Sequence, residues 1–150
     1  MVRPVRARDA QRWAEMRSRL WPHADFAELH REVDAFVTAK VTESILSAAF
    51  VADDDAAQAI GFIELSLRAF SDGCASSPVP HIEGWYVEPE ARRQGVGRAL
   101  IAAAEAWARE GGFTELASDV ELYNDASLRA HGACGFDEVE RLIKLRKALA

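Results

Sequence analysis

The stretch His81-Ile82-Glu83-Gly84-Trp85-Tyr86-Val87, followed closely by Arg92-Arg93-Gln94-Gly95-Val96-Gly97, decides the fold. The first segment has the composition of a β-strand, and Gly84 within it indicates a β-bulge or the close approach of another backbone. The second segment is a basic loop that contains glycine, and a helix is predicted directly after it. This order places the first turn of a helix beside the end of a bulged strand.

The loop has the features of a pyrophosphate site. The N-terminus of a helix presents unpaired N–H groups and a partial positive charge, so it attracts phosphate. Gly95 and Gly97 permit unusual backbone angles and omit the Cβ atoms that would block close approach, while Arg92, Arg93 and Arg98 add positive charge. The pattern is neither a P-loop nor a dinucleotide fingerprint, because no lysine follows the second glycine and a third glycine is missing. An ordinary helix start with solvated arginines stays open as the alternative.

Hydrophobic periodicity predicts the elements on both sides of this unit. Helices are predicted over residues 9–20, 25–40, 95–109 and 125–134, and strands over residues 2–5, 45–52, 60–69, 81–87, 113–120 and 139–145. Asp9 is expected to cap the first helix, which ends before Pro22. The mixture predicts an α+β fold with a mixed α/β sheet. We expect one domain over residues 1–150, because the sequence shows no repeat, low-complexity tract or long linker.

Composition narrows the class of function. The chain has 150 residues, of which 49% are hydrophobic and 28% are charged, and its net charge is −6. An acidic chain lacks the basic footprint that nucleic-acid binding requires. The charge fits a cationic substrate, although solubility alone is the simpler explanation. No apolar run approaches the ~20 residues of a membrane span, and Cys74 and Cys134 form neither a disulfide framework nor a metal-ligand cluster. We therefore expect a cytoplasmic protein with no membrane partner and no metal.

Two motifs carry a family resemblance. The hexapeptide from Arg92 to Gly97 has the form R-x-x-G-x-G after a strand, and Asn124 precedes a short predicted helix that ends in Gly135-Phe136. In this order and spacing the chain resembles the GNAT superfamily of acyl-CoA-dependent N-acetyltransferases over essentially its whole length.

This resemblance implies a GNAT-like, mixed and largely antiparallel sheet that is splayed at a bulged central strand and flanked by about four helices. It implies acetyl-CoA as co-substrate, with the pantetheine arm pairing with the bulged strand as an added strand would and the phosphates held by backbone N–H groups of the loop. The cofactor-binding residues expected on this basis are Trp85, Tyr86, Val87, Arg92, Arg93, Gln94, Gly95, Val96, Gly97, Arg98, Asn124 and His131.

The expected reaction is direct attack by an amine in a ternary complex, with a backbone N–H near Tyr86 or Val87 stabilising the oxyanion. Glu83 and Asp119 are the candidate catalytic carboxylates, and strand-end acids that face solvent are the alternative. His131 stands where many GNAT enzymes carry a tyrosine acid, so it could protonate the thiolate, contact CoA or pack. The general acid is left unassigned.

Longer strings resemble one group within the superfamily, the aminoglycoside 6′-N-acetyltransferases. They are Leu20-Trp21-Pro22, residues 72–78, Ile82-Glu83-Gly84, Ala117-Ser118-Asp119 and residues 135–141. The resemblance implies a polycationic sugar as substrate, antibiotic resistance as the outcome, and a homodimer in which the final strand often takes part. The implied substrate-binding residues are Trp21, His23, Phe70, Glu83, Asp119 and Glu140.

Two other readings stay open at this point. One is a GNAT enzyme that acetylates a different small amine, such as a polyamine, an amino acid or a peptide. The other is a non-catalytic module that binds CoA as a sensor.

Overall fold

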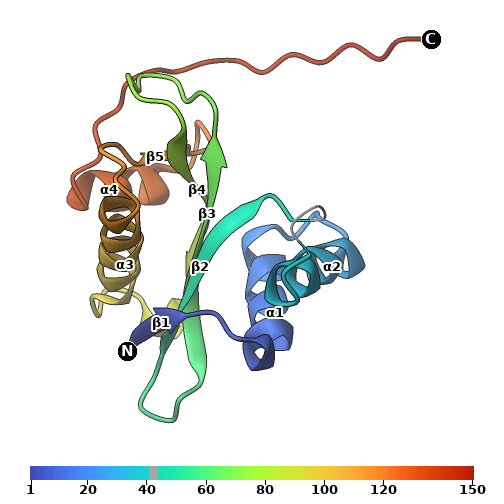
Figure 1. Cartoon of the computed structure of the whole chain (residues 1–150), viewed down its shortest axis with the longest axis vertical. Helices are drawn as coiled ribbons and strands as arrows, with labels where there is room; N and C mark the ends of the chain where they lie inside the picture. The colour runs from blue at the N-terminus through green and yellow to red at the C-terminus, as the bar shows by residue number, and fades with distance from the viewer. Residues whose placement is uncertain (41–43) are drawn as a thin grey trace.

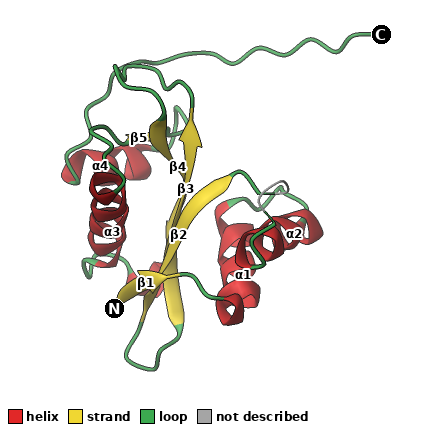
Figure 2. Ribbon diagram, in the orientation of Figure 1, coloured by secondary structure: helices red, strands yellow, loops and turns green. Residues whose placement is uncertain are grey.

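The computed structural model describes residues 1–40 and 44–150. Its centre is a sheet in the order β1-β2-β3-β4-β5 (Figures 1 and 2). The strands within the described residues are β1 (Val2–Pro4), β2 (Leu46–Asp53), β3 (Ala59–Arg68), β4 (Val79–Val87) and β5 (Ala117–Ser118). The first four are antiparallel to their neighbours, and β5 runs parallel to β4. This mixed, largely antiparallel sheet is the predicted one.

The sheet is interrupted in the middle of β4. Gly84 pairs with Glu64, and the next pair along is Ile82 with Leu65, so Glu83 is the extra residue of a bulge. Pairing between β4 and β5 is confined to His81 and Ile82 and stops where the bulge begins. Both the bulge expected at Gly84 and the splayed sheet are therefore confirmed.

Helices cover both faces of the sheet (Figure 1). On one side lie α1 (Ala10–Leu20) and α2 (Phe26–Val37), and on the other lie α3 (Val96–Glu110) and α4 (Asp125–Ala133). Two short 3-10 helices, Ala7–Asp9 and Pro89–Ala91, precede α1 and α3. In the part of the chain that the structure describes, no helix has both the length and the apolar character needed to cross a membrane.

Local chemistry explains where the helices begin. The Asp25 carboxylate caps α2 by accepting from the N–H of Glu28 at 2.9 Å, and the Asn124 side chain caps α4 by accepting from the N–H of Ser127 at 3.1 Å. Asp9 precedes α1 as predicted but does not cap it. Its carboxylate instead accepts two hydrogen bonds from the buried Arg3, at 2.7 and 2.9 Å.

The alternation along β3 divides the core into two layers. Phe62 packs with Trp13 of α1 and Val33 of α2, whereas Ile63 and Leu65 pack against α3. Along β3, the alternation of Ile63, Leu65 and Leu67 with Glu64, Ser66 and Arg68 therefore corresponds to two faces. The polar face is not simply solvated, because α1 lies over Glu64 and leaves it 0% exposed.

Two of the strand predictions were wrong, one in its length and one in its existence. The strand expected over residues 113–120 is reduced to Ala117–Ser118, because β4 offers a partner over only two residues there. Residues 139–145 form no strand, and Figure 1 shows the C-terminal segment running away from the fold. Its apolar residues satisfy a strand pattern, but a strand also needs a partner, and these residues pair with no strand in the described part of the chain.

Candidate cofactor and acceptor site

The loop before α3 is shaped to leave backbone N–H groups free. Arg93 has a φ of 60° and Gly95 a φ of 84°, so the chain turns sharply into the helix at Val96. The first intrahelical bond runs from Ala99 to the Gly95 carbonyl at 3.0 Å, and no side chain caps the helix. The earlier N–H groups of α3 are therefore available to an anion. A Cβ at Gly95 would meet no atom within 4 Å, so the mouth of the loop is open.

Two side chains of this loop, Arg92 and Gln94, stabilise its conformation by binding nearby backbone carbonyls. Arg92 donates from Nε to the Val87 carbonyl at 2.8 Å, and its guanidinium lies 5.8 Å from the centre of the Tyr86 ring. Gln94 donates to the Glu90 carbonyl at 2.9 Å. These contacts pin the loop to the end of β4. Backbone groups and glycines are thus the parts best placed to meet a pyrophosphate, so the residues present fit CoA.

Trp85 and His131 form the wall beside the start of α3. Their rings meet edge to face with centroids 5.0 Å apart, and a Cβ at Gly97 would stand 3.0 Å from Trp85 Cζ2. His131 is buried, with Nδ1 2.8 Å from the Ser127 carbonyl and Nε2 2.8 Å from Ser118 Oγ. Both ring nitrogens therefore have partners within the protein, which favours the packing alternative for His131 over the acid.

Tyr86 and Asn124, both expected at the cofactor, use their side chains elsewhere. The Tyr86 phenol is buried on the α1 face and donates to Glu88 Oε2 at 3.0 Å. The Asn124 side chain is occupied in capping α4. Only their backbone groups are left for the expected role, as is also the case for Val96 at the helix start.

The bulge turns Glu83 toward the α1 face. Its carboxylate accepts from Arg68 Nε and Nη2, both at 2.9 Å, and from the hydroxyl of Ser66. In a regular strand, consecutive residues point to opposite faces. The extra residue breaks this rule, so Glu83 and Gly84 both lie on the face that carries Ser66 and Arg68.

The electrostatics of Glu83 follow from these bonds. Burial raises the pKa of the Glu83 carboxyl, but the hydrogen bonds from Arg68 and Ser66 outweigh burial, so its pKa lies below the usual value. The group is therefore a carboxylate at neutral pH, with Arg68 as its internal counter-ion.

Asp119 follows β5 and faces a buried histidine. His81 is 3% exposed, and its Nε2 lies 3.4 Å from Asp119 Oδ2. His81 lowers the pKa of Asp119 and burial opposes this, with smaller contributions from Lys144 and Arg68. Since the Asp119 side chain is 66% exposed, this carboxylate has room for a substrate ammonium. Arg68 and His81 affect the pKa of both Glu83 and Asp119, so the structure brings the two acids into one electrostatic environment.

Trp21 lies on the same face as the bulge. It follows the last residue of α1 and is half-buried, and its Cη2 atom would be 2.8 Å from a Cβ at Gly84. An aromatic surface therefore stands directly beside the backbone of the bulge, one residue from Glu83.

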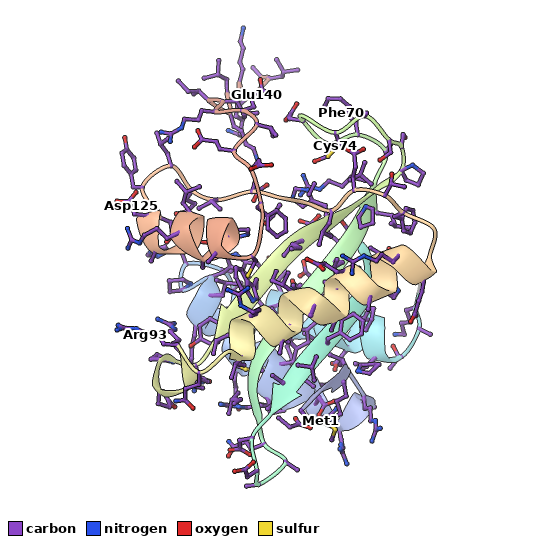
Figure 3. All side chains as sticks on the ribbon, turned by 90° about the vertical axis from the view of Figure 1, so that its left-hand side faces the viewer. Met1, Phe70, Cys74, Arg93, Asp125 and Glu140 are labelled. Carbon is purple, nitrogen blue, oxygen red and sulfur yellow. The ribbon has the colours of Figure 1, made fainter. Side chains whose placement is uncertain are left out.

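The other expected acceptor residues are exposed. His23 is exposed in the turn after α1, and Phe70 is 70% exposed in the loop after β3. Figure 3 places Phe70 and Glu140 at one end of the view and Arg93 away from both. Glu140 is exposed on the C-terminal segment that follows α4.

Sequence reasoning missed four residues that shape the site. Arg68 and Ser66 bind Glu83, His81 faces Asp119, and Arg17 lies under the Trp21 ring. The sequence held a signal for two of them, because the alternation of residues along β3 puts Ser66 and Arg68 on one face. What the pattern could not show is that the bulge would move Glu83 onto that face.

A bulged strand, a splayed sheet and a helix start with free N–H groups define an acyl-CoA-dependent acetyltransferase. A model of the acetyltransferase (GNAT) family matches residues 10–136, and the chain belongs to this family. Within it the chain groups with the aminoglycoside N(6′)-acetyltransferases. It is 47% identical to the type 1 enzyme of Klebsiella aerogenes, over 99% of this chain and 97% of that one.

Other similar proteins agree with this placement. The type 1 enzyme of Stenotrophomonas maltophilia is 40% identical, over 99% of this chain and 93% of that one. Among solved structures, AAC(6′)-Iy in complex with the bisubstrate analogue CoA-S-monomethyl-acetylneamine superposes with a TM-score of 0.89 at 35% identity, covering 99% of this chain and 98% of that one. The chain is thus an acetyltransferase with acetyl-CoA as its co-substrate.

Proposed function

We propose that this chain transfers the acetyl group of acetyl-CoA to the 6′-amino group of aminoglycosides, by direct attack in a ternary complex. The observation that carries the proposal is the bulge, which puts the Glu83 carboxylate and the Trp21 ring on one face where β4 and β5 separate. The names of the similar enzymes, including the complex with an acetylneamine analogue, support the choice of acceptor.

Acetyl-CoA supplies an activated thioester when it is bound. The chain would hold its pyrophosphate with backbone N–H groups from Arg93 to Arg98, and its pantetheine arm along the backbone of Trp85, Tyr86 and Val87. An N–H near Tyr86 or Val87 is the proposed oxyanion donor. The edge of β4 beyond Ile82 has no pairing with β5, which supports this path.

The two carboxylates would bind and orient the acceptor's ammonium groups. Their lowered pKa keeps Glu83 and Asp119 charged at neutral pH, so they attract a polycation. The proposed route for the acceptor's proton is transfer to one of these carboxylates, directly or through an intervening water. Trp21 would carry a sugar ring, with His23, Phe70 and Glu140 at the margin of the site.

We further propose that residues 1–150 form one catalytic domain that works as a homodimer. The C-terminal segment carries a large exposed apolar surface, because Val139, Ile143, Leu145 and Leu149 are 64%, 84%, 91% and 88% exposed. A second copy would cover it, and light scattering during gel filtration tests the mass.

The two free cysteines, Cys74 and Cys134, fit a reducing compartment, so we place the reaction in the cytoplasm.

An assay of CoA release tests the function. The chain is expected to turn over with kanamycin-type aminoglycosides that carry a 6′-amine, and to be inactive with analogues that carry a 6′-hydroxyl. Activity on spermidine together with inactivity on every aminoglycoside would replace the proposed acceptor with another amine.

A further inference from the structure

Arg17 lies buried beneath the Trp21 ring. Its guanidinium carbon is 5.1 Å from the centre of the indole, a distance at which a cation is attracted to an aromatic face. The residue is 4% exposed, so the attraction acts with little competition from water. Trp21 is the C-cap of α1: its N–H donates to the Arg17 carbonyl at 2.8 Å, while its ψ of 73° ends the helix. The direction of its ring is therefore left to side-chain contacts.

Arg17 in turn is fixed from three sides. Its Nη1 donates to the Leu29 carbonyl at 2.9 Å and its Nη2 to Glu32 at 2.7 Å. Its Nε lies 3.1 Å from Oε2 of Glu64, and its Nη2 donates to Oε1 of Glu64 at 3.2 Å. A guanidinium held at this many points has one orientation.

Glu64 connects this anchor to the bulge. It is 0% exposed, it also accepts from the indole N–H of Trp13 at 3.1 Å, and it pairs with Gly84 across the sheet. Its Cγ would be 3.2 Å from a Cβ at Gly84, and Trp21 Cη2 would be 2.8 Å from the same point. Glu64, Arg17, Trp21 and Gly84 therefore form one closed series of contacts beside Glu83.

We propose that Arg17, held by Glu64, is a positioning residue that sets the Trp21 indole over the bulge and thereby determines the affinity for the acceptor. The inference rests on the acceptor site of the proposed function. It predicts that the Arg17–Glu64 pair affects aminoglycoside binding only through Trp21, and that it leaves acetyl-CoA binding and the chemical step unchanged.

The test replaces both side chains together, because replacing one alone leaves the other buried without its partner. In the full chain, Arg17→Met with Glu64→Gln is expected to raise the aminoglycoside KM roughly tenfold, from the usual strength of a buried cation–aromatic contact. The kcat and the KM for acetyl-CoA should stay within about twofold. Arg17→Lys, which keeps the ion pair but not the planar group under the ring, is a second variant and should raise the same KM at least about threefold.

A double-mutant cycle separates positioning from general support of the fold. In a Trp21→Ala background the double replacement should change the aminoglycoside KM by less than about twofold, because its effect is transmitted by the missing ring. A full tenfold effect in that background, or an unchanged KM in the presence of Trp21, would overturn the inference. A Trp21→Ala variant with a normal aminoglycoside KM would also overturn the inference. The proposed function would not fall with it, because that function is tested separately by the position of the acetyl group in the product.

Arg12→Met is the matched control. Arg12 lies on the same helix and binds another buried carboxylate, Glu88, at 2.7 Å, and Arg19 also binds Glu88. Its replacement removes a comparable ion pair away from Trp21, so the aminoglycoside KM should stay unchanged. A rise as large as that of the Arg17 variants would show that the KM responds to any loosening of α1, and would contradict the inference.

Discussion

The Trp21 ring occupies the space where a side chain at Gly84 would lie, so that a methyl group at Gly84 would stand 2.8 Å from the ring's Cη2 atom. This contact joins the end of α1 to the bulge in β4. It explains why a glycine occupies this position although its φ is not in the left-handed region: the space for a side chain is already filled by Trp21, Phe62 and Glu64.

Gly84→Ala should therefore damage the acceptor site. The methyl group must displace Trp21 or Phe62, which overpacks the core and should cost about 1–3 kcal/mol of unfolding free energy. The aminoglycoside KM should rise while the KM for acetyl-CoA changes little, as steady-state kinetics and thermal unfolding will measure. Gly132→Ala is the control, because no atom lies within 4 Å of its Cβ position on α4, and it should stabilise by about 0.5–1 kcal/mol. Equal kinetics for Gly84→Ala and the parent chain would contradict the contact.

Glu83→Gln and Asp119→Asn should each lower kcat/KM for aminoglycosides, by roughly 100-fold for a group that takes part in proton transfer. Each change removes a negative charge without changing the size of the side chain. Calorimetry should find the affinity for CoA unchanged, because neither residue lies at the loop before α3. A matched replacement in the second half of α3, Glu105→Gln, should be kinetically silent. If Asp119→Asn kept full activity, Asp119 would be a strand-end acid without a role in the reaction.

Burial raises the pKa of Glu64 to about 7, although Arg17 and Trp13 oppose this. A carboxyl whose pKa is higher in the folded state than in the unfolded chain contributes stability that is present below its unfolded pKa and is lost as the pH rises through about 7. Glu64→Gln cannot ionise, so its stability relative to the parent should increase between about pH 5 and pH 8, by an order of about 3 kcal/mol. Urea unfolding at both pH values measures this difference. A difference that does not vary with pH would show that the carboxyl titrates normally.

Gly97→Ala should weaken the binding of acetyl-CoA and leave the acceptor site intact. The new methyl group would meet Trp85 at 3.0 Å and push the wall of the site toward the pantetheine path. We expect the KM for acetyl-CoA to rise roughly tenfold, which corresponds to about 1.4 kcal/mol. The aminoglycoside KM should stay unchanged and serves as the internal reference. A raised aminoglycoside KM with an unchanged KM for acetyl-CoA would instead place Gly97 at the acceptor site.

Much of the fold could be predicted because local signals were strong. Asp25 and Asn124 cap the helices that follow them, and Gly135, with a φ of 90°, ends α4 where the sequence indicated. Predictions that needed a distant partner did less well. The strand expected over residues 113–120 is limited by its short pairing with β4, and residues 139–145 pair with no strand in the described part of the chain.

In the site, too, residues with a local sequence signal could be identified and residues that act through distant contacts could not. Glu83 and Gly84 could be identified because a glycine inside a strand indicates a bulge. Arg17, Arg68 and His81 could not, since each acts through a contact between elements that are separate in the sequence. The role expected of Tyr86 was a backbone role, and its side chain proved to be buried on the opposite side from Trp85.

The most direct test of the central claim is the position of the acetyl group in the product. After reaction of the chain with acetyl-CoA and kanamycin, two-dimensional NMR of the purified sugar should show a single new acetamide on the 6′-nitrogen, with the other amines unmodified. An acetyl group on any other nitrogen, or an unmodified kanamycin after prolonged incubation, would contradict the account.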